Sequence, residues 1–315
     1  MQELPHVGWG GDSDAFLVNG ALIFRFPRHP SARRALAVEA CLLPQLGPRV
    51  GLPIPRFRYV AQDVTDEGDT AGSTEGPLFV GYPAIPGAPL APNLFPAIAA
   101  DPATRERMAA QLSAFLAGLH TVPIEQAIAC GVEAPARSVR EQITHRYAVV
   151  RSNVYPVLAD DERRYLDRLF ASFLDAPRHF GWPPTICHGD LTSDHILHVP
   201  ANGVSSAGAV SVVRPGDETQ PPGIAGIIDF GDVCIGDPAG DFVWRFEYGD
   251  AFFGRVLDHY SLPVGDASAF ARVVGFRYQL MPTTEIAYGL ATGTPGYVEE
   301  GRRLLRNNRH RFGEA

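Results

Sequence analysis

The sequence predicts an α+β chain in two parts, a small antiparallel sheet with one helix and then a larger, mainly helical part. Three observations carry this prediction. Short β-type segments with turn signals fill the first 84 residues, the glycine- and proline-rich connector GYPAIPGAP follows, and helical periodicity dominates from about residue 104. We therefore place an N-terminal lobe at residues 1–84 and a C-terminal lobe at residues 85–315.

The first expected element is a β-hairpin over residues 7–27. The apolar segments AFLV and ALIFRF are separated by Asn19-Gly20, a dipeptide typical of two-residue hairpin turns. Gly8, Gly10 and Gly11 come before the hairpin and indicate a loop in which backbone amides are accessible. The beginning of the chain is thus expected to be a glycine-rich loop followed by two paired strands.

A helix is expected next, over SARRALAVEACLLPQLG, because its apolar residues recur at helical spacing. Ser31 is its expected N-cap and Gly47 its expected stop. FRYVAQ and PLFVGYPAI follow as expected strands on either side of a polar loop. These segments complete the small sheet of the predicted N-terminal lobe.

The C-terminal part alternates expected helices with short apolar strands. RERMAAQLSAFLAGLHTV and DERRYLDRLFASFLD are amphipathic, and EIAYGL and GYVEEGRRLLRNNR lie in the helical tail. Between them, TICHGDL is an apolar segment that runs into a loop, and HILHV and IAGIIDF read as strands. The polar segment over residues 200–223 is expected to be an exposed hairpin tip.

Composition narrows the class of protein and its location. The formal net charge is −8, which argues against nucleic acid as a partner and suits a cationic ligand. The start of the chain does not resemble a signal peptide, and the apolar runs are too short for a membrane span, so we expect a cytoplasmic protein. The four scattered cysteines form no CxxC pattern and are expected to be reduced thiols.

The chain contains no lysine, so all 27 of its basic residues are arginines. A phosphate-binding P-loop ends in Gly-Lys-Ser/Thr and is therefore excluded. Enzymes that form a Schiff base, including those that use pyridoxal phosphate, need a lysine amine and are excluded as well.

The most informative stretch is CHGDLTSDHIL, together with IIDFGD further along the chain. An HxD sequence at His188–Asp190, His195 five residues after Asp190, and a strand ending in Asp229-Phe230-Gly231 follow the plan of a kinase catalytic core. In that plan the first aspartate accepts the proton of the attacking hydroxyl and the second holds Mg²⁺. A strand–turn–strand unit would bring both to the same end of a hairpin.

Other interpretations of this stretch were weighed. A zinc site is disfavoured because the histidines and aspartates lack HExxH spacing, and a hydrolase triad because no GxSxG sequence occurs. A structural cluster that only caps a turn explains HxD alone, but it does not explain the IIDFGD sequence downstream.

The combination HGDLTSDHIL and GIIDFGDVCIGDPAGDF resembles the aminoglycoside phosphotransferase family, which has a protein-kinase-like bilobal fold. GWGGDSDAFLV, LFVGYPAIPGAPL and YVEEGRRLLR extend the resemblance over most of the chain, and TSDH and EIAYGL are most similar to the branch that phosphorylates a 2″-hydroxyl. The resemblance implies Asp190 as catalytic base, Asp229 as the principal Mg²⁺ ligand and His195 in a metal-site role. Many relatives have asparagine at the last position.

The resemblance also implies ATP or GTP as phosphate donor, bound at the N-terminal lobe. Arg25 occupies the place of the lysine that would contact the phosphates, and Glu39 would be its ion-pair partner. Gly10 and Gly11 would cover the phosphates, and Tyr82 lies in the expected hinge beside the nucleotide. The sequence does not decide between ATP and GTP.

The acceptor is expected to be a cationic, hydroxylated small molecule held by acidic side chains. The candidates are Asp194, Asp232, Glu247 and Glu285. Three functions stay open: an aminoglycoside O-phosphotransferase of the antibiotic-resistance type, a kinase of the same fold for a macrolide or other metabolite, and a kinase-like protein that binds without transfer. The oligomeric state is left unassigned.

Overall fold

The computed structural model describes residues 6–9, 12–62, 76–199, 221–261 and 265–313. The chain forms two compact units. Unit 1 comprises residues 1–134, 185–235 and 244–262, and unit 2 comprises residues 135–184, 236–243 and 263–315. The predicted division into lobes at residues 84 and 85 stays a prediction.

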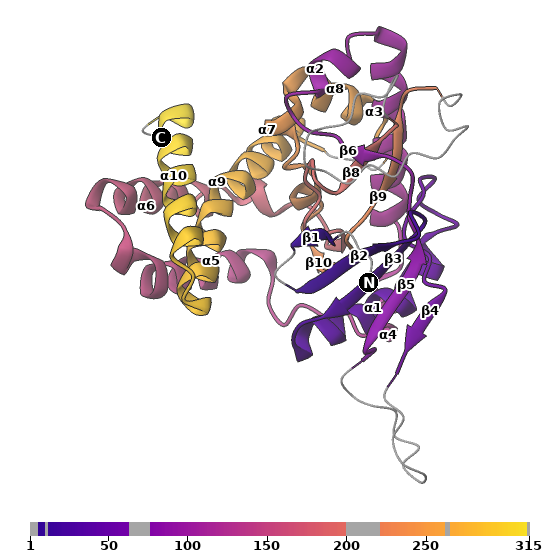
Figure 1. Ribbon diagram of the computed structural model, residues 1–315. Coiled ribbons are helices and arrows are strands. Elements are labelled where there is room, and N and C mark those ends of the chain that lie inside the picture. The colour runs from indigo at the N-terminus through magenta and orange to yellow at the C-terminus, as the bar shows by residue number, and fades with distance from the viewer. Residues whose placement is uncertain (1–5, 10–11, 63–75, 200–220, 262–264, 314–315) are drawn as a thin grey trace. The chain divides into compact units, whose positions relative to one another are not determined.

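The N-terminal part of unit 1 is a five-stranded antiparallel sheet with the strand order β1-β2-β3-β5-β4 (Figure 1). Its strands are β1 (His6–Trp9), β2 (Ser13–Val18), β3 (Leu22–Pro27), β4 (Tyr59–Ala61) and β5 (Phe79–Pro83). The predicted strands are therefore present, but Gly8 lies within β1 and not in a loop. Gly10 and Gly11 lie outside the described residues.

The predicted hairpin is formed by β2 and β3, whose register pairs Val18 with Leu22. Asn19 and Gly20 have φ values of 52° and 64°. Positive φ at both central residues is what a type I′ turn requires, and asparagine and glycine adopt it at low cost. The turn fixes the register and so places Arg25 opposite Ala15 on β2 and Val80 on β5.

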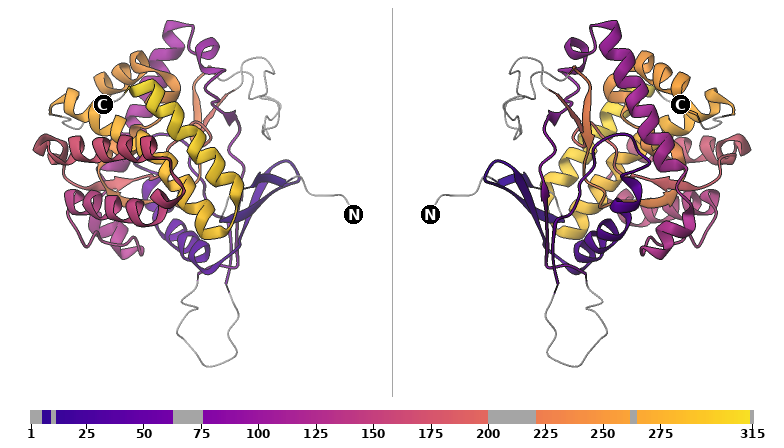
Figure 2. Two further views of the ribbon diagram at one scale, coloured as in Figure 1. Left: turned by 90° about the vertical axis from the view of Figure 1, so that its left-hand side faces the viewer. Right: turned by 90° about the vertical axis from the view of Figure 1, so that its right-hand side faces the viewer.

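Helix α1 (Pro30–Leu46) packs against β3 (Figures 1 and 2). Ser31 was predicted as its N-cap, and this is wrong: the cap is His29, whose Nδ1 accepts the Ala32 amide at 3.2 Å. The helix begins two residues earlier than predicted because Pro30 takes the first helical position, where its missing N–H costs nothing. Gly47 is the C-cap, as predicted.

The rest of unit 1 contains the helices and short strands that frame the central motif. The helices are α2 (Phe95–Ile98), α3 (Pro102–His120), α4 (Ile124–Ala129), α7 (Arg245–Tyr248) and α8 (Asp250–His259). The strands are β6 (Ala88–Pro89), β7 (Thr185–Cys187), β8 (Ile196–His198), β9 (Ile224–Ile227) and β10 (Cys234–Gly236). Strands β6, β8 and β9 form one sheet, and β7 pairs with β10. Both α3 and α4 pack against β7, the strand that leads into the HGD sequence.

Unit 2 is helical in its described residues. Its elements are α5 (Val139–Val149), η1 (Val150–Val154), η2 (Tyr155–Val157), α6 (Asp160–Leu174), η3 (Pro177–Phe180), η5 (Pro238–Phe242), α9 (Ala267–Thr292) and α10 (Pro295–Phe312). Its core is aromatic, with Phe173 and Phe276 stacked at a centroid distance of 3.7 Å. Glu162 is buried there and lies 3.4 Å from both Arg302 and Arg306. The aromatic packing joins α6 to α9.

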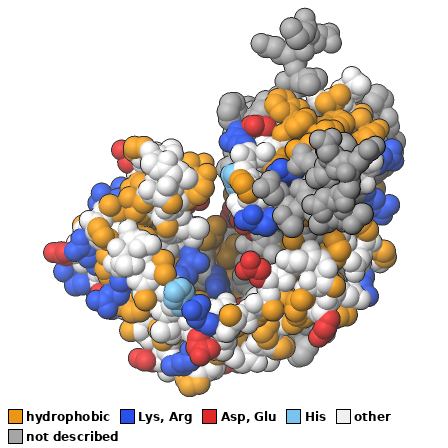
Figure 3. Space-filling model, turned by 90° about the horizontal axis from the view of Figure 1, so that it is seen from below, with side chains coloured by type: hydrophobic (Ala, Val, Ile, Leu, Met, Phe, Trp, Pro, Cys, Tyr) orange, Lys and Arg blue, Asp and Glu red, His pale blue; other side chains and the backbone are white. Residues whose placement is uncertain are grey.

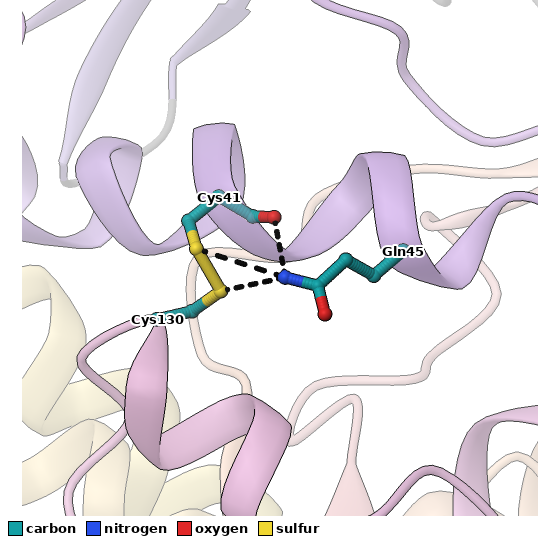
Figure 4. The surroundings of a disulfide bond; sticks show 3 residues. All are labelled: Cys41, Gln45 and Cys130. Carbon is teal, nitrogen blue, oxygen red and sulfur yellow. Dashed lines mark hydrogen bonds between the residues drawn. A yellow bond between two sulfur atoms is a disulfide. The ribbon is translucent and has the colours of Figure 1, made fainter.

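The prediction of four reduced cysteines is wrong for two of them. Cys41 on α1 and Cys130 after α4 form a disulfide, with Cα atoms 5.4 Å apart (Figure 4). This separation lies in the usual range for a disulfide. Cys187 and Cys234 are thiols; Cys187 is buried and Cys234 is exposed.

Among the described residues, no helix combines the length and apolar character needed to cross a bilayer. Figure 3 shows one side of the surface, where hydrophobic, acidic and basic side chains are interspersed; the basic side chains are all arginines.

Candidate active site

Strands β8 and β9 form an antiparallel hairpin (Figure 1), so the segment before β8 and the segment after β9, which carry the two motif aspartates, lie at the same end of it. His195 immediately precedes β8, and Asp229 follows β9 by two residues. The Ile228 amide donates to the His195 carbonyl at 3.0 Å and extends the pairing beyond the strands. The loop that carries Asp190 and the end of β9 are therefore held side by side.

His188 is buried and connects these two segments through hydrogen bonds. Its Nε2 lies 3.0 Å from the Ile228 carbonyl, and its Nδ1 lies 3.4 Å from the Asp190 amide. A carbonyl only accepts and an amide only donates, so Nε2 carries the proton and Nδ1 accepts. His188 therefore positions the backbone of Asp190 and is not itself directed at a ligand.

His195 lies between the two carboxylates. Its Nδ1 is 2.6 Å from the Asp190 carbonyl oxygen and 3.5 Å from Asp190 Oδ2, while its Nε2 is 3.6 Å from Asp229 Oδ2. Because the carbonyl only accepts, Nδ1 carries a proton, and Nε2 is the ring nitrogen that faces Asp229. The carboxylates of Asp190 and Asp229 thus lie beside the two different nitrogens of one imidazole ring.

Asp229 has an unusual backbone conformation, with φ at 63°. A left-handed conformation is uncommon outside glycine and often marks a functional position. Burial acts to raise the pKa of its carboxyl, but Arg25, the two histidines and the Gly231 amide together outweigh burial and lower it. The side chain is 45% exposed, so an ionised carboxylate remains open to a ligand.

Gly189 allows the Asp190 loop to approach the segment after Asp229. Its φ is 89°, and a Cβ at this position would lie 2.1 Å from the Asp232 carbonyl oxygen. A side chain is therefore excluded by contact as well as by backbone conformation. The glycine of HGD is needed for the close packing that assembles the site.

Arg25 and Glu39 form the predicted ion pair. Arg25 Nη1 donates to both carboxylate oxygens of Glu39, at 3.1 and 2.9 Å, and Nη2 reaches Asp229 Oδ1 at 3.4 Å. Gly231 adjoins this contact, and a Cβ there would lie 3.4 Å from Asp229 Oδ1. The ion pair between β3 and α1 is therefore joined directly to the aspartate that follows β9.

Burial governs the titration of the groups around Arg25. It raises the pKa of Glu39 to about 7 and that of Tyr82 to about 12, with Arg25 opposing both shifts. Burial acts to lower the pKa of the Arg25 guanidinium, but Glu39, Tyr82 and Asp229 together raise it above its ordinary value. Tyr82 itself is buried in β5 and pairs with Ile23. The guanidinium is therefore a permanent cation.

Three of the predicted acidic residues lie near Asp190 in the fold of unit 1. Asp194 is in the same loop and is exposed, and Asp232 adjoins Gly189. Desolvation, followed by the like charges of Asp190 and Asp229, raises the pKa of Asp232 to about 6, although the residue as a whole is exposed. Glu285 lies on α9 in unit 2, and its predicted role stays a prediction.

Glu247 on α7 holds the Asp190 loop. Its Oε2 accepts the Ser193 amide at 2.9 Å, and its Oε1 accepts the Ser193 hydroxyl at 3.1 Å. Burial raises the pKa of Glu247. The sequence offered no signal for this contact, which spans 54 residues. Both carboxylate oxygens of Glu247 already have partners within the chain. The predicted role of Glu247 in acceptor binding stays a prediction.

The chain superimposes on solved phosphotransferases. The GDP and kanamycin complex of APH(2″)-IIIa has a TM-score of 0.79 and 29% identity, and the match covers 98% of this chain and 94% of that one. The macrolide 2′-phosphotransferase MphH from Brachybacterium faecium has a TM-score of 0.66 and 21% identity, with 96% and 91% covered. The fold is therefore the kinase-like fold of these phosphotransferases, with an antiparallel sheet first and a mainly helical part after it, as predicted.

Residues 3–207, which are most of the chain, match the phosphotransferase enzyme family (APH), and the chain belongs to this family. Viomycin phosphotransferase from Streptomyces vinaceus is 31% identical over 193 residues, which are 61% of this chain and 57% of the relative. The chain thus spans little more than half the length of that relative.

Proposed function

We propose that the chain transfers the γ-phosphoryl group of a nucleoside triphosphate to a hydroxyl of a cationic, aminoglycoside-like acceptor. The observation that carries this proposal is the position of Asp190 and Asp229 on either side of the His195 imidazole. One carboxylate is then available for the proton of the acceptor and the other for the phosphate side of the reaction. The GDP-bound structural neighbours support a purine nucleotide as donor.

The donor atoms at Asp229 and His195 fit a magnesium ion. Asp229 supplies an ionised carboxylate, and His195 Nε2 lies 3.6 Å from its Oδ2 atom. Magnesium prefers oxygen ligands, so we assign Asp229 as the principal ligand and His195 to a supporting role. When bound, Mg²⁺ neutralises charge on the nucleotide phosphates.

In this proposal, residues of the chain accept the proton, position the reacting groups and contact the phosphates. The Asp190 carboxylate takes the proton of the acceptor hydroxyl, while His188 and His195 hold its backbone. The oxygen then attacks the γ-phosphorus and a nucleoside diphosphate leaves. We assign Arg25 to the phosphates in place of the usual lysine, because Nη1 is fixed to Glu39 and Nη2 lies beside Asp229. Tyr82 and the Gly10-Gly11 segment complete the proposed nucleotide site.

Acceptor recognition is assigned to the acidic residues beside Asp190. Asp194 and Asp232 are exposed carboxylates on the two segments that the β8–β9 hairpin brings together. An ammonium group of the acceptor is attracted by both, and its hydroxyl is thereby held next to Asp190. Glu247 contributes by fixing the loop through Ser193. We also propose that the protein acts in the cytoplasm.

The direct test is a nucleotide-by-acceptor activity panel. ATP and GTP are each paired with aminoglycosides, viomycin, macrolides and simple sugars, and diphosphate release is coupled to a dye reaction. We expect turnover with at least one aminoglycoside, and GTP is the first donor to try because the neighbours with 29% identity are GDP complexes. Turnover only with a macrolide or sugar would move the acceptor to another class. Nucleotide binding without any turnover would instead favour a binding protein.

Acceptor binding is expected to depend on the ionisation of Asp232. Its pKa is about 6, so the carboxyl is neutral below this pH and attracts a cation only above it. We expect the KM for a cationic acceptor to fall by about fivefold as pH rises from 5 to 7, the effect of one exposed ion pair. The measurement is KM against pH for the wild type and Asp232→Asn. The same inflection in both proteins would contradict the assignment.

A further inference from the structure

The disulfide lies on the helix that carries Glu39. Cys41 follows Glu39 by two residues on α1, and at 100° per residue the two side chains leave the helix on nearly opposite sides. Glu39 is therefore directed at Arg25 while Cys41 is directed at Cys130. Val38 is on the same side as Cys41, and a Cβ on Gly131 would lie 3.4 Å from it. This side of α1 is the contact surface for the end of α4.

The other end of the disulfide is connected to the Asp190 loop. Cys130 is the C-cap of α4, and its amide donates to Gln126 and Ala127 at 3.2 and 3.0 Å. Helix α4 packs against β7, which runs directly into the HGD sequence. The disulfide thus links the helix that holds Arg25 to the element that supports Asp190.

The pair has the features of a disulfide that can be exchanged. Cys41 is exposed and Cys130 is 8% exposed, so a thiol attacks at Cys41. Gln45 Nε2 donates to Cys130 Sγ at 3.0 Å and to the Cys41 carbonyl at 3.1 Å (Figure 4). A donated hydrogen bond stabilises a thiolate more than a thiol, which makes Cys130 the better leaving group.

We propose that Cys41 and Cys130 are a redox modification site that sets nucleotide affinity through the position of Glu39. The inference rests on the proposed function. A dithiol supplies two electrons and two protons: its thiolate attacks Cys41 and expels Cys130, and its second thiol releases Cys41. The products are two cysteine thiols and an oxidised dithiol. Reduction frees one side of α1, while its buried leucines keep the chain folded.

The expected effect follows from the role of the arginine–glutamate pair. When α1 is released, Glu39 holds Arg25 less firmly, and the guanidinium turns away from the phosphates toward Asp229, which it already reaches at 3.4 Å. We expect reduction to weaken nucleotide binding by about fivefold or more, the size of a typical coupling between two sites. Reoxidation restores the original affinity.

The experiment measures the Kd of GDP with the full chain in both redox states. Thiol titration in denaturant first defines the states, with two thiols expected before treatment with dithiothreitol and four after it. Cys41→Ser is expected to show the weaker Kd in both states, and the matched control Cys234→Ser to keep the redox response. Glu39→Gln is expected to lose the response, since the effect passes through this carboxylate. Reduced wild type provides the same comparison if Cys41→Ser does not fold.

The outcomes separate the two proposals. Equal GDP affinity in the oxidised and reduced wild type, with the thiol counts as stated, overturns the redox inference and leaves the proposed function intact. A redox response that persists in Glu39→Gln overturns the assigned route through α1. Absence of binding of both GDP and ADP in both states overturns the proposed function and with it this inference.

Discussion

Replacement of Asp190 by alanine is expected to lower kcat by roughly 100- to 10,000-fold, the usual range for loss of a catalytic base. Nucleotide affinity is expected to change by less than about twofold. The reason is positional: the Asp190 side chain is assigned to the acceptor hydroxyl, and the contacts with Arg25 are made by Glu39 and Asp229. Single-turnover transfer and nucleotide Kd, measured on the same preparation, test the expectation.

The control for this variant must preserve the loop. Asp190→Asn keeps the shape of the side chain, and both variants keep the backbone contacts with His188 and His195. Both are therefore expected to fold normally and to lose transfer. Nucleotide binding that falls in proportion to the rate would contradict the role of Asp190 as base, because it would place the residue on the phosphate side.

Replacement of Asp229 by alanine is expected to weaken binding of the magnesium nucleotide by about tenfold or more, as loss of a group that supports a metal usually does. In the absence of magnesium the sign reverses. Asp229 then faces the phosphates as an anion and also contacts Arg25 Nη2, so its removal leaves nucleotide affinity unchanged or raises it. Calorimetry with and without magnesium measures both effects.

Alanine at position 229 also removes a residue that adopts a positive φ. Asp229→Asn tolerates this conformation better and serves as the matched control. Both variants are expected to lose the magnesium dependence of binding. A magnesium-nucleotide Kd equal to that of the wild type would show that the metal is held elsewhere.

Local signals account for the parts of the fold that were foreseen. The Asn19-Gly20 turn requires positive φ at two successive residues, and this sequence pair tolerates it, so the hairpin and the position of Arg25 on it could be predicted. The ends of helices were less secure. Ser31 was predicted as the N-cap from its residue type, whereas His29, which is not a preferred N-cap residue, accepts the Ala32 amide in the structure.

The contacts that could not be foreseen join segments far apart in the chain. The disulfide closes a separation of 89 residues, and nothing in the spacing of four cysteines indicates which two meet. The same holds for Ser193 and Glu247, whose pairing depends on how α7 packs. For Arg25 and Glu39 the pair was predicted from a resemblance, which already contained the tertiary information.

The central claim is that Asp190 serves the acceptor and Asp229 serves the nucleotide. It is tested most directly by a quench-flow measurement of phosphate transfer from labelled GTP or ATP, already saturating, in the Asp190→Ala variant. We predict that this variant binds the nucleotide as the wild type does and transfers almost none of it in the first turnover. Transfer at the wild-type rate from the bound nucleotide would contradict the account.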